Sequence, residues 1–231
     1  MAAILRSKQT WVFDLDNTLY PAECDLFSQI DARMTGFVSE QLSLEKEAAR
    51  ALQKQYYLEH GTTLKGMMVD HAVQPEQFLA HVHDIDYSGL PNDTRLKAAL
   101  EKLPGQKYVF TNGSKGHAGN VTRQMGLQDV FDGMFGIEDA FYEPKPSRAA
   151  FDLFVQTFAV NPSEAVFFED LTRNLEPAYA MGFGTVLVRS GKDWSHEPEG
   201  ARPANADDHV PDHVHHVTDH LAEFLEQVMS G

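Results

Sequence analysis

The sequence predicts an α/β fold: a parallel sheet with helices on both faces, interrupted after its first strand by an all-α insertion. Short, continuously apolar segments alternate with helical patterns in the second half of the chain, which is typical of strands buried on both faces. Before this alternating region, residues 21–87 show apolar side chains at helical spacing and no strand pattern.

The first strand is predicted in the apolar segment that begins at Trp11 and breaks off at Asp14 and Asp16. Because side chains alternate along an extended chain, the two aspartates point the same way. Two such carboxylates repel each other unless a cation or a shared proton lies between them. From this segment alone, a solvated turn and a metal site are equally good interpretations.

The insertion is predicted to contain several amphipathic helices. Asp25 and Ser43 are expected to cap the first two helices, and Gly61 is expected to end the second. Pro75 suits the first turn of a later helix. The apolar spacing predicts helices over residues 26–38, 44–59 and 75–82.

From Pro91 onward, predicted helices and strands alternate, and Asp93 is expected to cap the first of these helices. Residues 192–212 are rich in Pro, Gly, Asp and His and are expected to form loops. Further strands are predicted at residues 108–110, 134–137, 165–168 and 185–188, and helices at residues 94–103, 114–125, 147–158, 174–181 and 217–229.

The composition of the 231-residue chain is that of a soluble globular protein, with 42% hydrophobic and 23% charged residues. Its formal net charge of −15 argues against nucleic-acid polymers and anionic membranes as partners, but not against a small phosphorylated substrate. Cys24 is the only cysteine, which excludes a disulfide framework and a thiolate metal cluster. Residues 1–10 have no signal-peptide core and no transmembrane-length segment follows, so we expect a cytoplasmic protein. The sequence leaves monomer and homodimer open.

Reactive side chains follow three of the predicted strands. The two aspartates follow the first, Thr111 follows the second, and Glu169 and Asp170 follow a third. Lys145 lies in a loop expected to open on the same side. Ligands of open parallel sheets bind beyond the carboxyl ends of the strands. A nucleophile, a second acid, metal ligands and a cation at one sheet edge indicate phosphoryl transfer.

Four short motifs occur here in the order in which they occur in phosphatases of the haloacid dehalogenase (HAD) superfamily, and the chain resembles that family. The insertion matches the position of the family's small helical cap. The resemblance implies a Rossmann-like core domain of residues 1–20 and 90–231 and a cap domain of residues 21–89. The four motifs are residues 14–18, 111–113, 145–146 and 169–170, and residues 13–21, 56–57, 61–64 and 82–87 are similar to the pyrimidine 5′-nucleotidase branch.

The resemblance implies a Mg²⁺-dependent phosphomonoesterase that hydrolyses pyrimidine nucleoside 5′-monophosphates such as UMP and CMP. Asp14 would be the nucleophile that forms an aspartyl-phosphate, and Asp16 would be the general acid and base, which requires a raised pKa. Mg²⁺ would be held by Asp14, the backbone carbonyl of Asp16, and Asp170, with Glu169 acting directly or through water. Phosphate binding is expected from Leu15, Thr111, Asn112, Gly113 and Lys145.

Some of these residues have alternative interpretations. Lys115 competes with Lys145, which we favour because proline flanks it and restricts its loop. Thr111 is also a candidate helix cap, and Asn174 fits either a supporting role or a helix surface. Eight residues of the insertion are candidates to line a base pocket, although tyrosines at helical spacing are more often core. They are Tyr56, Tyr57, His60, Thr62, Thr63, His83, Asp84 and Asp86. The histidines at positions 209, 213, 215, 216 and 220 fit a solvated tail better than a metal site.

Three functional alternatives remain at this stage. Phosphatases for another small ester, such as phosphoglycolate or a sugar phosphate, and phosphomutases share the core residues and differ in the cap. Haloacid dehalogenases lack the second aspartate of the first motif, so Asp16 disfavours them. A catalytically silent binding protein would be indicated by the loss of a motif residue, and none is lost.

Overall fold

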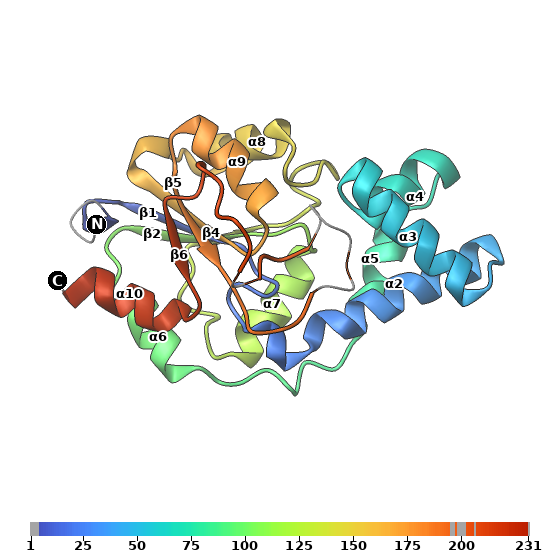
Figure 1. The fold of residues 1–231 in the computed structure, drawn as a ribbon, viewed down its shortest axis with the longest axis horizontal. Coiled ribbons are helices and arrows are strands. Elements are labelled where there is room, and N and C mark those ends of the chain that lie inside the picture. The colour runs from blue at the N-terminus through green and yellow to red at the C-terminus, as the bar shows by residue number, and fades with distance from the viewer. Residues whose placement is uncertain (1–4, 195–196, 198–201, 206, 231) are drawn as a thin grey trace.

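The computed structural model describes residues 5–194, 197, 202–205 and 207–230 of the chain. Helices cover two faces of a parallel sheet, and a group of helices lies to one side of this core (Figure 1). This is the predicted fold class. The remaining residues include the start of the N-terminal segment and part of the predicted loop region 192–212, so those predictions lie partly outside the described residues.

The described residues form a six-stranded sheet in which every neighbouring pair of strands is parallel. The first strand lies near the middle, so Phe13 is aligned with Val109 on one side and with Phe168 on the other. In spatial order the strands are β3 (Gly133–Phe135), β2 (Gln106–Phe110), β1 (Thr10–Phe13), β4 (Ala165–Glu169), β5 (Gly184–Val188) and β6 (His216–Thr218).

The two faces of the sheet are covered by different helices (Figure 1). One face carries α6 (Thr94–Glu101), α7 (Lys115–Gln124) and α10 (Leu221–Ser230), and the other carries α8 (Arg148–Phe158) and α9 (Thr172–Met181).

Side chains of β1 alternate between the two hydrophobic clusters that these helices complete. Trp11 and Phe13 belong to the cluster beside α6, α7 and α10, and Val12 belongs to the cluster beside α8 and α9. All three are at most 1% exposed. Burial on both faces explains why this strand is apolar throughout, and why its polar residues appear only where it ends.

The insertion between β1 and α6 consists of helices, and the described part of residues 21–87 contains no strand, as predicted. Most of its buried apolar side chains form a separate hydrophobic cluster, which Ile137 of the core joins, whereas Leu26 of α2 belongs to a cluster of the core. The exact domain boundaries, 21–89 against 1–20 and 90–231, stay a prediction. The elements of the insertion are η1 (Ala22–Cys24), α2 (Leu26–Leu42), α3 (Lys46–His60), α4 (Thr63–His71) and α5 (Pro75–Val82).

Two of the predicted helix caps are wrong. Asp25 precedes α2, but its carboxylate bonds the side chains of Ser28 and Lys192 rather than a backbone amide of the first turn. Ser43 ends α2 in the left-handed conformation, and α3 begins only at Lys46. The roles predicted for Asp93, Gly61 and Pro75 at helix ends are confirmed.

Two elements differ from the predicted ones. Residues 217–229 were expected to form one helix, but β6 pairs with β5 and the helix begins only at Leu221. Three residues are too few to show a strand pattern. Helix α4 was not predicted separately, although Thr62 caps it by accepting a hydrogen bond from the Lys65 amide at 3.1 Å.

The histidines near the C-terminus do not form a free tail, so that prediction is wrong for three of them. His213 Nε2 lies 2.9 Å from the carbonyl oxygen of Thr172, and His215 Nδ1 accepts a hydrogen bond from the Thr185 amide at 3.1 Å. His216 belongs to β6. These contacts attach the last strand to the edge of the sheet.

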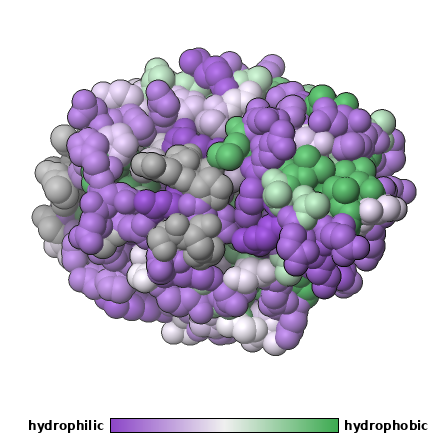
Figure 2. All heavy atoms as spheres, turned by 45° about the vertical axis from the view of Figure 1, so that its right-hand side comes forward, coloured by the Kyte–Doolittle hydropathy of each residue, from purple (hydrophilic) through white to green (hydrophobic). Residues whose placement is uncertain are grey.

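Hydrophilic side chains cover most of the face that Figure 2 shows, and hydrophobic ones gather on its right-hand part, on the side where Figure 1 shows the insertion. Leu58 on α3 and Val69 on α4 are 51% and 60% exposed. Within the described ranges, no helix combines the length and apolar character needed to cross a membrane. The cytoplasmic location stays a prediction.

Gly66 allows α4 to pack closely against α3. A Cβ atom at this position would lie 2.2 Å from Cγ of Tyr56, which is buried. We expect Gly66→Ala to destabilise the protein by about 1–3 kcal/mol, because the core of the insertion has no room for the methyl group. Thermal unfolding followed by circular dichroism measures the change.

Gly36→Ala is the matched control, since Gly36 lies inside α2 of the same insertion and an added Cβ would have nothing within 4 Å. We expect it to raise stability by up to about 1 kcal/mol through helix propensity. Equal effects of the two substitutions would show that the close contact does not matter.

Candidate active site

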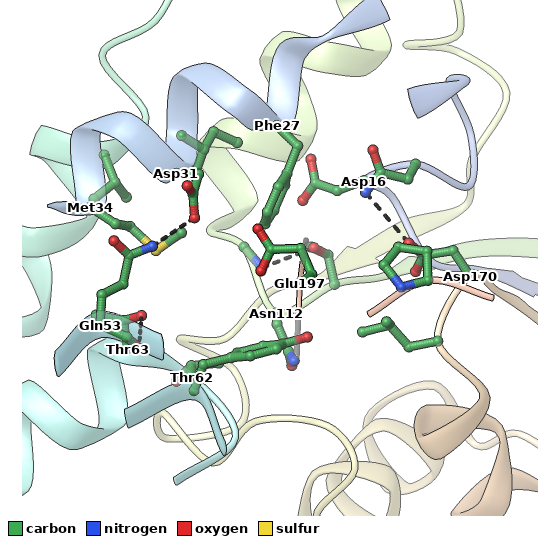
Figure 3. A pocket seen from close by; sticks show the side chains of 18 of the residues that line it. Asp16, Phe27, Asp31, Met34, Gln53, Thr62, Thr63, Asn112, Asp170 and Glu197 are labelled. Carbon is green, nitrogen blue, oxygen red and sulfur yellow. Dashed lines mark hydrogen bonds between the residues drawn. The ribbon is translucent and has the colours of Figure 1, made fainter. Parts of the chain in front are cut away.

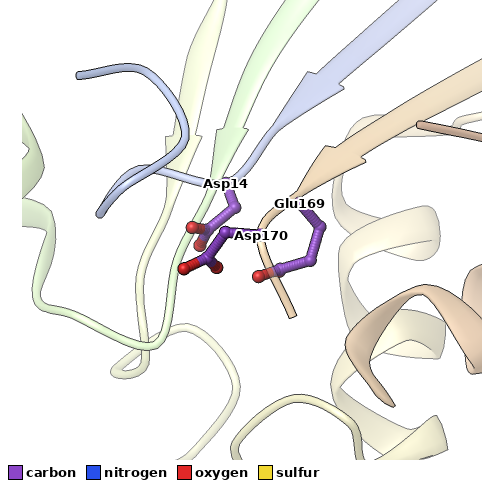
Figure 4. A group of neighbouring side chains, drawn as sticks. All are labelled: Asp14, Glu169 and Asp170. Atoms are coloured by element: carbon purple, nitrogen blue, oxygen red, sulfur yellow. The ribbon is translucent and has the colours of Figure 1, made fainter. Parts of the chain in front are cut away.

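The carboxyl ends of three adjacent strands bring the predicted reactive groups together. Asp14 follows β1, Thr111 follows β2, and Glu169 ends β4 beside Asp170. The amide of Asp14 donates to the carbonyl oxygen of Phe168 at 2.8 Å, which extends the pairing of β1 with β4 up to the first acid. Figure 4 shows the carboxyl groups of the three acids gathered beyond the strand ends. All four residues are at most 6% exposed.

The ammonium group of Lys145 lies at the centre of this cluster. Its Nζ donates hydrogen bonds to Asp14 Oδ1 at 2.7 Å, to Glu169 Oε2 at 2.8 Å and to the carbonyl oxygen of Phe110 at 2.8 Å. The residue is 1% exposed. Its competitor Lys115 instead pairs with Asp139 and its side chain is 50% exposed. The position of Lys145 among the acids therefore agrees with the expectation that Lys145, and not Lys115, is the lysine of this site.

Asn112 fixes the loop that carries this lysine. Its side-chain oxygen accepts the amide of Lys145 at 2.8 Å, and its Nδ2 donates to the carbonyl oxygen of Lys145 at 3.1 Å. Thr111 does not cap the next helix, because Ser114 does so. Thr111 Oγ1 accepts the amide of Gly113 at 2.9 Å. Leu15 is fully buried and its carbonyl oxygen accepts the Leu19 amide at 3.0 Å, so its predicted phosphate contact stays a prediction.

The carboxylates of the cluster carry more negative charge than one lysine compensates. Burial raises the pKa of Asp14 to about 7, with further contributions from Glu169 and Asp16 that Lys145 opposes. Burial and the neighbouring Glu169 and Asp14 raise the pKa of Asp170 well above its ordinary value. Burial lowers the pKa of Lys145, but the two acids that it contacts outweigh burial and raise it. A further cation would relieve this repulsion.

The acids fit a divalent metal ion with oxygen ligands. Asp14, Glu169 and Asp170 each offer one carboxylate oxygen, and these atoms lie within 4.8 Å of one another. Mg²⁺ prefers such ligands and relieves carboxylate repulsion. Within the described residues the C-terminal histidines belong to no such group. The contribution predicted for the backbone carbonyl of Asp16 stays a prediction.

Asp16 has an environment that differs from the predicted one. Its Oδ1 accepts hydrogen bonds from Tyr20 at 2.5 Å and lies 2.9 Å from Nε2 of His117. Burial raises the pKa of Asp16, but the charge and hydrogen bond of His117 and the bond from Tyr20 outweigh it, so the net shift is downward. The expected raised pKa is therefore wrong for the free site, because Asp16 has hydrogen-bond donors that no sequence pattern indicated.

The acids open into a pocket of about 440 Å³ that extends under the helical insertion. Figure 3 shows Asp16 and Asp170 at one end, and Asp31, Gln53 and Thr63 at the other. Of the cap residues predicted to line a base pocket, Tyr57, Thr62, Thr63 and His83 line it, whereas Tyr56, His60, Asp84 and Asp86 do not.

The four cap residues outside the pocket have other contacts or are exposed. Tyr56 is 3% exposed, and its hydroxyl lies 2.8 Å from Nε2 of His71, so it belongs to the core of the insertion. Asp84 pairs with Arg33 at the surface, and the side chain of Asp86 caps the turn at Ser88.

Sequence reasoning missed a polar cluster at the far end of the pocket. Asp31 accepts hydrogen bonds from Gln53 at 2.7 Å, Lys54 at 2.9 Å and Arg50 at 2.6 Å. The carboxylate of Glu197 lies 2.8 Å from Lys54 Nζ. On the sequence the four residues in α2 and α3 look like the ordinary polar side of an amphipathic helix, and no motif distinguishes them or Glu197.

Asn174 at the start of α9 is 2% exposed and lines the pocket, so it is not on a helix surface. Its Oδ1 has no hydrogen-bond partner among the described residues. Next to it, Arg173 stacks on the ring of Tyr57 with 4.3 Å between the guanidinium carbon and the ring centroid. This contact connects α9 of the core to α3 of the insertion.

Comparison with known proteins identifies the family of this chain and structures of similar fold. Phosphate metabolism protein 8 of Saccharomyces cerevisiae is 27% identical over 212 residues, which cover 84% of this chain but only 65% of that protein. Two of the solved structures that match this chain are a phosphatase and a dehalogenase. A HAD phosphatase from Thermococcus onnurineus gives a TM-score of 0.62 at 19% identity, covering 96% of this chain and 98% of that one. L-2-haloacid dehalogenase from Xanthobacter autotrophicus gives 0.58 at 18% identity, with the same coverage.

At these identities the two solved structures indicate a common fold and do not separate phosphatase from dehalogenase. A sequence model of the family described as haloacid dehalogenase-like hydrolase matches residues 9–182, which span β1 to α9 and include all the acids of the cluster. The chain therefore belongs to the haloacid dehalogenase-like hydrolases.

Proposed function

We propose that this hydrolase is a Mg²⁺-dependent phosphomonoesterase in which Asp14 is the nucleophile. The observation that carries the proposal is the cluster in which Lys145 contacts Asp14 while Glu169 and Asp170 offer metal-binding oxygens beside it. Bound Mg²⁺ would neutralise the acids and polarise the phosphoryl group. Asp14, Asp170 and the backbone carbonyl of Asp16 are proposed to hold it, with Glu169 acting directly or through water.

The residues around Asp14 have distinct proposed tasks. The Asp14 carboxylate attacks phosphorus and forms an aspartyl-phosphate, so hydrolysis is divided into two in-line steps. Lys145 orients this carboxylate and compensates charge on the phosphoryl oxygens. Thr111 and the amides of Asn112 and Gly113 bind those oxygens, with phosphate replacing Thr111 Oγ1 as the acceptor of the Gly113 amide. Asn112 keeps Lys145 in place through its two hydrogen bonds to the lysine backbone.

Asp16 distinguishes this proposal from dehalogenation. It would protonate the leaving oxygen in the first step and take a proton from the attacking water in the second. Haloacid dehalogenases resemble this chain in fold and nucleophile but lack the second aspartate. Asp16 lines the pocket near Asp14, where a leaving group would emerge.

We propose pyrimidine nucleoside 5′-monophosphates as the substrate class. The ring of Tyr57, which stacks on Arg173, and the side chain of Thr62 line the pocket. The ring suits stacking on a base, and the Thr62 hydroxyl, whose oxygen caps α4, has its hydrogen to donate. The similarity of the cap segments to the pyrimidine 5′-nucleotidase branch supports the same substrate. Another small ester, such as phosphoglycolate or a sugar phosphate, or a phosphomutase reaction, is the alternative.

Asp14→Asn should reduce hydrolysis of p-nitrophenyl phosphate by roughly 10⁴-fold or more, because an amide cannot serve as the nucleophile. Phosphate release with and without EDTA measures both the role of Asp14 and the need for metal. Activity retained in the variant or in EDTA would contradict the proposal. Chloride release from 2-chloropropionate by the wild type would favour dehalogenation.

The raised pKa of Asp14 makes the stability of the metal-free protein depend on pH. Because the folded-state pKa is about 7 and the unfolded value is about 3.9, the stability that this group contributes is complete below about pH 4 and is lost as pH rises through 7. In EDTA, wild type should therefore lose stability relative to Asp14→Asn between pH 5 and pH 8, as measured by urea unfolding. Mg²⁺ should restore the stability of the wild type at pH 8. If the unfolding free energies of the two proteins change in parallel with pH, the acids do not carry uncompensated charge.

UMP and CMP should be hydrolysed faster than AMP, GMP or phosphoglycolate. Tyr57→Ala should lower kcat/KM for UMP by about tenfold, since stacking of a base on an aromatic ring contributes about 1–3 kcal/mol. The same variant should hydrolyse ribose 5-phosphate, which has no base, at an unchanged rate. Equal rates across the panel, or a preference for a sugar phosphate, would overturn the nucleotide assignment and leave the phosphatase assignment intact.

A further inference from the structure

His117 is a fully buried polar residue for which the proposed mechanism has no use. Its side chain is 0% exposed and lies on α7, directly beside Asp16. Its Nε2 is 2.9 Å from Asp16 Oδ1. A buried imidazole in contact with the general acid of a reaction has a direct effect on the orientation of that acid.

The ring of His117 is held on several sides. It stacks on the ring of His83, with centroids 4.4 Å apart and planes 8° apart. Ser114 accepts the amide of His117 at 3.1 Å, and its hydroxyl lies 3.0 Å from Nδ1 of His83. A Cβ at Gly113 would lie 3.2 Å from Cδ2 of His117, so the glycine leaves room for the ring. The imidazole therefore has one orientation.

The second ring nitrogen of His117 connects the core to the insertion. Nδ1 lies 3.1 Å from the hydroxyl of Tyr87, and this hydroxyl is also 3.0 Å from the carbonyl oxygen of His83. His83 and Tyr87 belong to the segment between α5 and α6, through which the chain returns from the insertion to the core. A continuous hydrogen-bonded chain thus runs from Asp16 through His117 to this connecting segment.

The hydroxyl of Tyr87 carries one hydrogen and has two acceptors within reach. When it donates to Nδ1 of His117, Nε2 carries the ring hydrogen and donates to an ionised Asp16. When Asp16 is protonated, the same N–H group can still donate to Oδ1, because the proton then lies on Oδ2, from which the leaving oxygen can take it. The N–H group at Nε2 is therefore a hydrogen-bond donor to Oδ1 in both forms of Asp16 that the reaction produces.

We propose that His117 is a positioning residue that holds the carboxyl group of Asp16 towards the leaving oxygen, with Tyr87 connecting it to the segment that joins the insertion to the core. The inference rests on the proposed phosphatase function. In the first step the bond from phosphorus to Asp14 forms, the bond to the leaving oxygen breaks, and that oxygen takes the proton of Asp16. In the second step water replaces Asp14 on phosphorus and returns a proton to Asp16.

The test compares two esters that differ in their need for an acid. p-Nitrophenolate is stable enough to leave without being protonated, whereas the ribose oxygen of UMP must be protonated as it leaves. In His117→Phe, which keeps an aromatic ring against His83, kcat/KM for UMP should fall by roughly 100-fold, the effect of misplacing a catalytic group by about 1 Å. For p-nitrophenyl phosphate it should fall much less. kcat/KM reports the steps up to the departure of the leaving group. Hydrolysis of the aspartyl-phosphate, which is the same for both esters, therefore does not affect the comparison.

Three further variants separate positioning from packing. His117→Gln restores an N–H group and should recover part of the UMP activity. Tyr87→Phe removes only the hydroxyl that contacts Nδ1 of His117. It should lower kcat/KM for UMP relative to p-nitrophenyl phosphate, as His117→Phe does, but by a smaller factor. Thr122→Val removes a buried hydroxyl of the same helix that bonds the Ala118 carbonyl at 2.8 Å, and should leave the ratio unchanged.

The outcomes are distinct. A wild type that hydrolyses neither ester overturns the proposed function and this inference with it. A wild type that hydrolyses both, with His117→Phe equally impaired on both, overturns the inference alone. If His117→Phe does not fold, as judged by circular dichroism, Tyr87→Phe decides, and an unchanged ratio in that variant overturns the inference.

Discussion

The burial of the Lys145 ammonium group among carboxylates is the constraint on which the rest of the site depends. A lysine that is 1% exposed requires compensation for its charge, and Asp14, Glu169 and the carbonyl oxygen of Phe110 provide it. Because the lysine donates to both Asp14 and Glu169, it also holds these acids close together, although their charges repel. Removing the lysine would leave buried acids unpaired, which typically costs about 3–5 kcal/mol. Asn112 contributes by holding the lysine backbone.

The sheet supplies the geometry that this cluster needs. Because β1 lies between β2 and β4, its carboxyl end has a reactive residue on each side, Thr111 and Glu169. The insertion leaves the core directly after β1 and returns to α6, so the helices that cover the pocket are attached to the chain beside the acids. The reactive residues thus lie at the ends of strands, and the residues that can select a substrate lie in the insertion.

The core of the site was predictable from sequence, and so was the helical nature of the insertion, whereas the contacts that the insertion makes around the pocket were not. Strands buried on both faces are continuous apolar segments, and the polar residues that end them stand out, which identified Asp14 and Asp170 among others. His117 carries no such signal, since a histidine in a helix usually packs without any functional contact, and its position beside Asp16 depends on tertiary structure. The downward pKa shift of Asp16 follows from that unpredicted contact. Strand β6, with three residues, is too short for any pattern.

The most direct test of Asp14 as a nucleophile beside a metal site is a crystal structure with Mg²⁺ and beryllofluoride, which imitates an acyl phosphate. We predict beryllium bonded to a carboxylate oxygen of Asp14, its fluorine atoms in contact with Lys145 and Thr111, and Mg²⁺ bound to Asp170. Beryllofluoride bonded to Asp16, or a metal ion that does not contact Asp170, would contradict it.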